Sequence, residues 1–476
     1  MAGIDALLAS RPPAAPDLDA RLSAALQRAR SGGRGVILSL TGRWSAGEDP
    51  AAVVWASRRP GEPWFCLEQP ARGGAAICGL GSAHEMLARG RERFQTLAGQ
   101  WRELVRRAVA DEPVGPPGAG LAAISGFAFA AHGAQAEKWR GFPTASLTVP
   151  EVSLVRRAGE TWLTLNLAVS PDDTAEDLGR RLDARVSELH ARPLPMLDPD
   201  PAGRFRVTSP MPPAHYEEAV ARAVQRIRQG ELEKIVLARE VEVQAPLHHD
   251  PGAVLGVLRD AFPSCYVYAV GRGEATFIGA SPELLVRREG LRATTVALAG
   301  STGRSADPAV DDHLGERLLR SDKDRQENSI VARRIARALA PHSVWVTVAP
   351  DPTVVRVANI QHLAAPIRAQ LARPMSAIEL AGILHPTPAV GGEPWRVAEP
   401  LIPALEGFDR GWYAGTVGWC DQTGDGEFCV ALRCALLRAQ TATCYAGCGI
   451  VADSEPAAEL AETEVKLQAL LPVLAG

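Results

Sequence analysis

Two pairs of acidic residues in this sequence have a spacing that suits metal binding. Asp324 and Glu327 are three residues apart, as are Glu459 and Glu462, and both pairs lie in segments with helical periodicity. Residues at i and i+3 share one face of a helix, which is also the pattern of an ordinary solvated face. Several carboxylates together favour a hard cation such as Mg²⁺, which prefers oxygen ligands. Lys466, one turn after Glu462, would place a positive charge on the same face.

The second chemical feature is the segment 445–466, YAGCGIVADSEPAAELAETEVK. It is predicted to run from a strand through a glycine-rich turn into a helix. Backbone N–H groups at such a turn can hold a carboxylate or a phosphate. The string GCGIVA resembles a dinucleotide fingerprint only loosely, because no second βαβ unit follows it. We therefore expect an anion site here and no nucleotide site.

The elements that would position these groups follow from hydrophobic periodicity. Upstream, alternating apolar runs predict strands at 35–40, 51–57 and 161–169, with one helical segment around 83–109. The proline-rich stretch 191–213 lacks a sustained period and is typical of a connection. We therefore divide the chain into an N-terminal α+β half at 1–190, a linker at 191–213 and a catalytic half at 214–476.

The catalytic half begins with a predicted helix, HYEEAVARAVQRIRQG, which should stop at Gly230. The segment KIVLAREVEV then changes to β-branched alternation and predicts a strand. Further strands are expected at 265–272, 275–280, 283–288 and 291–298, followed by a long helix over 311–340. Strands interleaved with long helices predict a large α/β or α+β body.

Composition limits the classes of partner. The 476 residues carry a net charge of −4 with well-mixed acidic and basic residues, so we expect no nucleic acid partner. No apolar run is long enough to cross a bilayer and the first residues lack a compact hydrophobic stretch, so we expect no membrane partner and a cytoplasmic location. The eight cysteines show no CxxC spacing and are expected to be buried free thiols.

Eight sequence blocks stand out in the second half of the chain. They are KIVLARE (234–240), FIGASPELLVRREG (277–290), ALAGSTGR (297–304), SDKDRQEN (321–328), LHPTPAVGGEP (384–394), GWYAGTVGW (411–419), FCVALRCALL (428–437) and the segment 445–466. In their order and spacing these blocks resemble the chorismate-utilising family of isochorismate, salicylate, anthranilate and aminodeoxychorismate synthases. The resemblance is strong over 213–476 and loose before it. It implies the large α+β chorismate-binding fold of anthranilate synthase component I, with antiparallel sheets flanked by helices.

The resemblance also implies a role for each matching acid and base. Glu327 and Glu462 match the principal Mg²⁺ ligands, with Glu459 and Asp324 supporting the metal, which would clamp the substrate's ring carboxylate. Lys234 matches a lysine that acts as general base on water. A lysine can serve in this way only if burial or a nearby cation lowers its pKa.

The remaining matches concern the substrate. Glu283 corresponds to the acid that protonates the departing C4 hydroxyl, and His385 to a histidine that orients this hydroxyl. Ser301 stands where the family usually has threonine, and retains the hydroxyl group. Positions expected to contact the ring or the enolpyruvyl carboxylate are Gly300, Ser301, Tyr413, Arg433, Gly447 and Lys466.

Two positions distinguish members of the family by their nucleophile. Ammonia-using enzymes resembling anthranilate synthase usually have glutamine at the position of Lys234. Aminodeoxychorismate synthases commonly carry a nucleophilic lysine where this chain has Ala299. The resemblance therefore implies water as the nucleophile, and an Mg²⁺-dependent isochorismate synthase, an isomerase, acting on chorismate.

Other functions remain possible alternatives to an isochorismate synthase. A salicylate synthase would share Lys234, Glu283 and the metal ligands and would also eliminate pyruvate. An ammonia-using subunit and a non-catalytic chorismate-binding homologue are further alternatives. We expect no glutaminase subunit and a monomer or weak homodimer. The sequence does not indicate whether the product serves menaquinone, a siderophore or another pathway.

Overall fold

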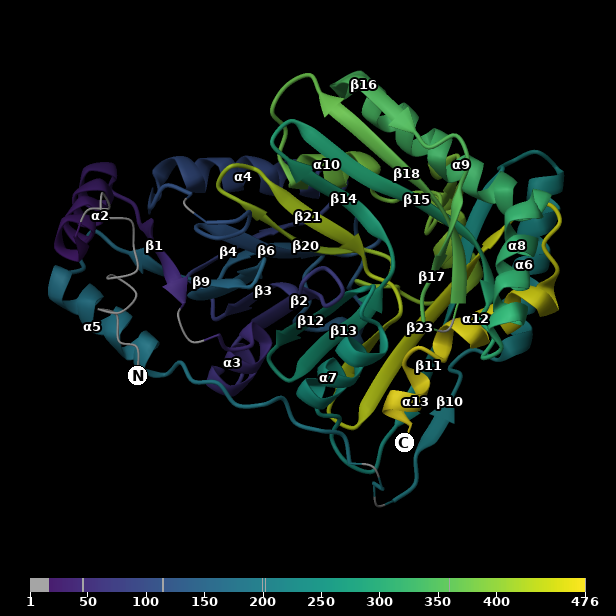
Figure 1. Cartoon of the computed structure of the whole chain (residues 1–476), viewed down its shortest axis with the longest axis horizontal. Coiled ribbons are helices and arrows are strands. Elements are labelled where there is room, and N and C mark those ends of the chain that lie inside the picture. Colours follow the sequence, from purple (N-terminus) through teal and green to yellow (C-terminus); the bar gives the residue numbers. More distant parts are fainter. Residues whose placement is uncertain are drawn as a thin grey trace.

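Two large β-sheets form the centre of the protein (Figure 1). The computed structural model describes residues 17–44, 47–113, 115–198, 200–201, 203–358 and 360–475. Within these residues the first sheet has 13 strands. Their order is β10 (Arg206–Thr208), β11 (Lys234–Gln244), β23 (Thr441–Ile450), β22 (Cys434–Arg438), β13 (Ala275–Ser281), β12 (Tyr266–Arg272), β2 (Trp64–Gln69), β3 (Ala75–Leu80), β8 (Val152–Arg157), β9 (Glu160–Val169), β1 (Val36–Trp44) and β5 (Val109–Ala110), with β19 (Gly392–Glu393) paired to β11.

The second sheet has 10 strands within the same described ranges. Its order is β16 (Ser343–Val348), β18 (Ile360–Leu371), β15 (Arg292–Gly303), β14 (Leu284–Glu289), β21 (Gly426–Val430), β20 (Thr416–Asp421), β6 (Ala122–Phe127), β7 (Ala145–Val149) and β4 (His84–Ala88), with β17 (Thr353–Arg356) paired to β18. Described neighbours pair antiparallel, except that β1 and β5 pair parallel.

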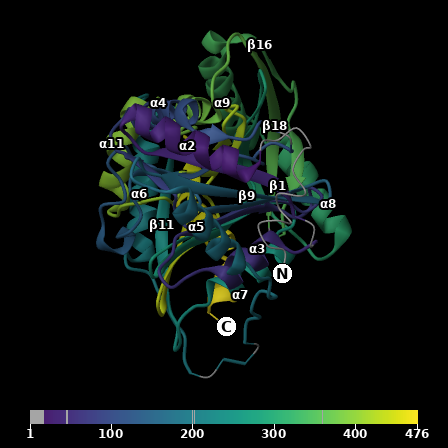
Figure 2. The same cartoon turned by 90° about the vertical axis from the view of Figure 1, so that its left-hand side faces the viewer.

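Helices cover the outer faces of these sheets (Figures 1 and 2). Helices α2 (Leu18–Gly32), α3 (Pro50–Ser57), α5 (Ala175–Ser187) and α7 (Pro251–Ala261) pack on the first sheet, and α4 (Arg93–Arg107), α9 (Asp322–Leu339) and α10 (Ala377–Leu384) on the second. The others are α6 (Pro213–Arg228), α8 (Pro308–Arg320), α11 (Trp395–Glu406), α12 (Pro456–Leu467) and α13 (Leu471–Leu474), with short 3₁₀ turns at Glu137–Trp139 and Ala340–His342. The expected α+β fold, with antiparallel sheets flanked by helices, is confirmed.

Both sheets combine strands from the two sides of 191–213. Strand β12 pairs with β2 in the first sheet, and β20 pairs with β6 in the second. The described residues between α5 and β10 form no helix or strand. The division of the chain at 191–213 stays a prediction, but the two parts share their sheets.

The core has two parts because successive strand residues face opposite sides of a sheet. On β2, Phe65 and Leu67 join a cluster that extends to the second sheet and its helices. Trp64 and Cys66 instead join a cluster that includes residues of α2, α3, α5 and α7. The first sheet is therefore buried on both faces, which fixes the register of the strands that carry the site.

Three sequence predictions of local structure were wrong. The helix predicted around 83–109 begins only at Arg93, because residues 84–88 form strand β4, which pairs with β7. The segment 51–57, predicted as a strand, forms α3, which begins with Pro50 after Asp49, whose side chain accepts a hydrogen bond from Ala51 N. This helix is buried nearly all round, so its apolar run has no amphipathic period. The single helix predicted over 311–340 is two helices, because Ser321 caps α9 by accepting a hydrogen bond from Asp324 N.

In the part of the chain that the structure describes, no helix combines the length and apolar character needed to span a bilayer.

Candidate active site

Most of the expected site residues meet at one small cavity of about 60 Å³. It lies where β11 and β23 of the first sheet meet β15 and β18 of the second, beside α9 and α12. The expected residues that line it are Glu283, Gly300, Ser301, Glu327, Tyr413, Arg433, Gly447, Glu462 and Lys466. They come from segments as far apart as 180 positions in the sequence, so tertiary pairing assembles the site.

Lys234 lies against this cavity through its contact with Glu327. It is the first residue of β11 and its side chain is fully buried. Its Nζ lies 2.8 Å from Glu327 Oε1, although the two groups are not aligned as a hydrogen bond. A cation and a carboxylate thus meet at one wall of the cavity.

Gly449 makes room for this pair. A Cβ at position 449 would lie 2.3 Å from Glu327 Oε1 and 2.7 Å from Lys234 Cε, closer than side chains can approach. Gly449 is the cross-strand partner of Val236. Val236 lies two residues after Lys234 on β11, so the two side chains face the same side of the sheet. The sequence analysis named Gly447 but missed Gly449, although the two alternate on β23 and so share a face.

Glu283 supplies the second carboxyl group of the cavity. It follows β13, where its N–H donates to Ser281 Oγ and its carbonyl accepts from Val430 N. Burial raises the pKa of Glu283 to about 8, against the opposing charges of Lys234, Arg433 and Lys466. Glu283 is therefore protonated at neutral pH and can donate a proton.

Glu462 has the opposite electrostatic environment. Burial favours the neutral acid, but the Lys466 ammonium at 2.7 Å and a hydrogen bond from Ser301 Oγ at 2.8 Å outweigh it and hold the pKa of Glu462 at about 2. Glu462 thus stays ionised, and the cavity presents one acid and one carboxylate. The protonated Glu283 can donate a proton, whereas the ionised Glu462 can hold a cation.

Four carboxylates, Asp324, Glu327, Glu459 and Glu462, form what we call the acidic cradle. Asp324 and Glu459 do not line the cavity. Burial raises the pKa of both, and the charge of Glu462 adds to the shift in each case. Lys323 Nζ donates to Glu459 Oε1 at 3.0 Å. The carboxylate oxygens of the acidic cradle are the ligands that a hard divalent cation prefers. The buried Cys448 thiol lies nearby, with its sulfur within 4.8 Å of Glu459 and Glu462 oxygens.

The structure does not bring His385 to the cavity. His385 ends α10, its Nε2 lies 3.0 Å from the Phe129 carbonyl oxygen, and its ring packs near Phe94 and Phe129. A different histidine, His362 of β18, lines the cavity. The sequence analysis missed His362 because a histidine in the apolar strand IQHLAAPI is typical of a core position. Burial and the nearby Arg433 lower the pKa of His362 to about 3, so its ring is neutral.

Arg433 and Tyr413 line another side of the cavity. Arg433 has a left-handed backbone conformation, φ 47°, and its Nη2 lies 3.1 Å from His362 Nε2. Tyr413 stacks on Tyr445 with ring centroids 5.1 Å apart. Lys466 Nζ donates to the Gly447 carbonyl oxygen at 2.8 Å. Two cations and a phenol therefore face the same small space, as recognition of a carboxylate requires.

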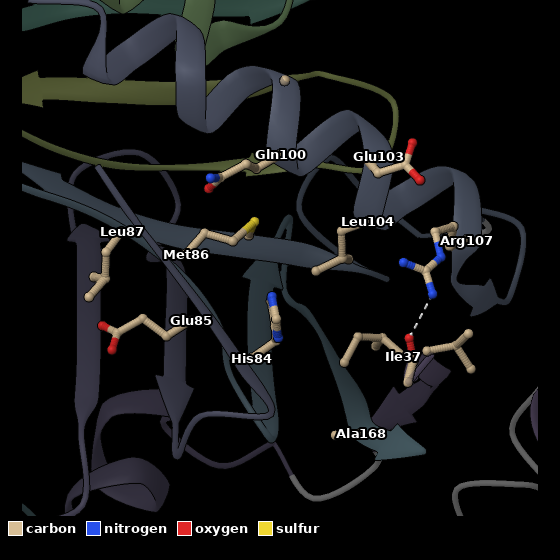
Figure 3. A pocket seen from close by; sticks show the side chains of 13 residues that line it. Ile37, His84, Glu85, Met86, Leu87, Gln100, Glu103, Leu104, Arg107 and Ala168 are labelled. Atoms are coloured by element: carbon tan, nitrogen blue, oxygen red, sulfur yellow. Dashed lines mark hydrogen bonds between the residues drawn. The ribbon is translucent and has the colours of Figure 1, made fainter. Parts of the chain in front are cut away.

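A larger cavity of about 710 Å³ lies elsewhere, between α4, β4 and the start of β1 (Figure 3). Met86 and Leu104 contribute to its apolar walls, and His84, Glu103 and Arg107 are among its polar groups. Arg107 Nη2 donates to the Gly35 carbonyl oxygen at 3.1 Å. Because its acids and bases do not converge as in the smaller cavity, it is not the candidate active site.

Comparison with known proteins places these features in a family. The family model described as chorismate binding enzyme matches residues 24–475. The salicylate biosynthesis isochorismate synthase of Pseudomonas aeruginosa is 37% identical over 432 residues, which cover 90% of this chain and 88% of that protein. Isochorismate synthase MenF of Bacillus subtilis is 32% identical over 407 residues, covering 84% and 85%.

Solved structures agree with this assignment. MenF, the menaquinone-specific isochorismate synthase of Escherichia coli, has a TM-score of 0.76 and 25% identity, with 95% of this chain and all of that chain covered. Anthranilate synthase component I of Streptococcus pneumoniae shares the fold, with a TM-score of 0.62, 22% identity and coverage of 85% and 89%. The sequence match over nearly the whole chain, together with the fold, shows that this protein belongs to the chorismate-binding enzyme family.

Proposed function

We propose that this protein is an isochorismate synthase, an Mg²⁺-dependent isomerase that interconverts chorismate and isochorismate. In this reaction water adds at C2, the C4 hydroxyl leaves and the ring double bonds shift. The observation that carries the proposal is that Glu283, Glu327 and Glu462 line one cavity, with Lys234 in contact with Glu327. The names of the two relatives and of the E. coli structure support the same activity.

Glu283 and Lys234 are the proposed acid and base. Glu283, which burial keeps protonated at neutral pH, gives its proton to the departing C4 oxygen. Lys234 acts as the neutral amine, which takes a proton at Nζ from the attacking water, so the ammonium that contacts Glu327 must first release its own proton. Enclosure of both groups in a small cavity excludes other water and strengthens their interaction with the substrate. Proton transfer of this kind contributes roughly 10²–10⁴-fold to a rate.

The other cavity residues bind and orient the substrate. Arg433, Lys466 and Tyr413 hold the enolpyruvyl carboxylate with charge-assisted hydrogen bonds. His362, neutral across the physiological range, orients the C4 hydroxyl in the role that the sequence suggested for His385. A cavity of about 60 Å³ requires side chains to move apart for a ring to enter, and Arg433 must then exchange His362 for the substrate.

The acidic cradle is the proposed magnesium site. Glu327 and Glu462, which line the cavity, would hold the ion, with Asp324 and Glu459 supporting them. When bound, Mg²⁺ would supply positive charge to the substrate's ring carboxylate and fix the ring. Lys234 and Ala299 favour water as the nucleophile. Because a glutaminase subunit supplies ammonia, the protein is proposed to act without one.

Product analysis tests the proposal. Purified protein is incubated with chorismate and MgCl₂, with and without ammonium, and the products are separated by chromatography. Isochorismate in both reactions, abolished by EDTA and restored by MgCl₂, is expected. Salicylate with pyruvate would identify a salicylate synthase instead, an aminated product would identify an ammonia-using enzyme, and absence of turnover would reject catalysis.

The base is tested separately with Lys234→Ala. This variant should lose water addition, with kcat reduced by about 10²-fold or more because proton transfer from water is unassisted. Chorismate should still bind, because the carboxylate-binding groups remain, and its binding is measured by calorimetry. Turnover equal to that of the wild type would reject Lys234 as the base.

A further inference from the structure

Three lysines neutralise the acidic cradle, and they differ in their freedom to move. Lys234 contacts Glu327, Lys466 contacts Glu462 and Lys323 contacts Glu459. The side chains of Lys234 and Lys466 are 0% and 10% exposed, whereas that of Lys323 is 37% exposed. An ammonium that loses its carboxylate inside the protein keeps an uncompensated buried charge, which is strongly unfavourable. Only Lys323 of these three can leave its partner and reach water.

The space into which Lys323 can move is a polar cleft of about 420 Å³. Lys323 is part of its wall, together with Gln326 of the same helix and the loop that precedes β11. Glu231, Glu233 and Asp453 also line this cleft. Glu231 and Glu233 already pair with Arg226 and Arg333, so a displaced ammonium would be stabilised mainly by solvent and by Asp453.

The carboxylate that Lys323 contacts, Glu459, is buried and therefore depends on a nearby cation. Glu459 is 2% exposed and lies beside the ionised Glu462. Without an adjacent cation this buried carboxylate would be destabilised by desolvation and by its neighbours.

We propose that Lys323 is a resident counter-ion of the acidic cradle, which a divalent cation displaces from Glu459 into the polar cleft. The inference rests on the proposed Mg²⁺-dependent function and extends it. Lys323 compensates the charge of the cradle before the metal arrives, and competes with the metal afterwards. Its ammonium therefore sets the metal affinity of the enzyme without touching the substrate.

The test compares Mg²⁺ binding by the wild type and by Lys323→Met, using the full chain stripped with EDTA and titrated with MgCl₂ at constant ionic strength. Isothermal titration calorimetry should give a Kd for the variant that is about two- to fivefold lower, the factor expected when a partly exposed ion pair no longer competes. Arg325→Met is the matched control. Arg325 lies two residues further along α9, is 45% exposed and pairs with Asp351, so its loss removes the same charge outside the cradle and should leave the Kd unchanged.

Thermal unfolding gives a second measurement that does not depend on catalysis. Metal-free Lys323→Met should melt below the metal-free wild type, because Glu459 has lost its cation, and saturating MgCl₂ should remove the difference. Equal or weaker Mg²⁺ binding by Lys323→Met would overturn the inference, as would equal tightening in Arg325→Met. Absence of Mg²⁺ binding by both the wild type and Lys323→Met would instead overturn the proposed magnesium dependence itself.

Discussion

Glu283 and Glu462 show how single residues acquire their chemistry here. They are the same residue type in the same cavity, yet the pKa of Glu283 is about 8 and that of Glu462 is about 2. Desolvation acts on both, but only Glu462 has an ammonium at 2.7 Å and a hydroxyl donor to offset it. The protonation states therefore follow from the close partners of each group and not from burial alone.

Glu283→Gln should separate activity from stability. The variant lacks the acid, so kcat should fall by about 10²–10⁴-fold. Its free energy of unfolding should exceed that of the wild type by an amount that grows as pH rises from about 4.5 to about 8, because in that range the unfolded glutamate ionises while the folded one stays protonated. Chemical denaturation at several pH values measures the difference, and a variant less stable than the wild type at pH 8 would contradict it.

The two histidines should respond differently to substitution. His362→Asn removes the neutral ring that lines the cavity and should lower kcat by about 10²-fold through misplacement of the reacting hydroxyl. His385→Asn should change the melting temperature more than kcat, because His385 contacts Phe129 outside the cavity. Steady-state kinetics and thermal melts of both variants decide the matter. A larger loss of kcat in His385→Asn would return the substrate-orienting role to that residue.

At the scale of elements, the site depends on how closely β23 approaches α9 and β11. Gly449→Ala tests this approach. The added Cβ would overlap Glu327 and Lys234, so we expect a loss of about 1–3 kcal/mol in stability and about 10²-fold in kcat. Denaturant unfolding and steady-state kinetics measure the two effects.

Gly99→Ala provides the control for this substitution. Gly99 lies inside α4, where an added Cβ meets nothing within 4 Å. Because alanine is the better helix former, Gly99→Ala should stabilise the protein by about 0.5–1 kcal/mol and leave kcat unchanged. Full activity in Gly449→Ala would show that the Lys234–Glu327 contact tolerates displacement.

At the scale of the whole molecule, both sheets depend on strands from the two parts of the chain. A fragment limited to 214–476 would contain every expected site residue but would lack the strands that pair with β12 and β20. Its sheets would end in long unpaired edges, which promote aggregation. We therefore expect this fragment to be insoluble or to show no cooperative unfolding by circular dichroism. A soluble fragment with a sharp thermal transition would show that the part before 214 is dispensable for folding.

Local patterns in the sequence were sufficient to predict part of this protein. Backbone periodicity alone places Asp324 with Glu327, and Glu459 with Glu462, on single helix faces, and the two helices are observed. The strand that begins at Lys234 and the helix before it were also predicted from the change of period at that point. The resemblance to chorismate-utilising enzymes was carried by short blocks and is confirmed by the family match.

Other features of the site could not be predicted from these local patterns, because they depend on tertiary contacts. The position of His362 at the cavity and of His385 away from it, the need for glycine at position 449 and the raised pKa of Glu283 all depend on groups distant in sequence. Periodicity reports which face of an element is buried, because it arises from neighbouring residues. Burial of a charge, by contrast, depends on which strands pair and what then closes over the group, and the pairing of β12 with β2 joins segments about 200 residues apart.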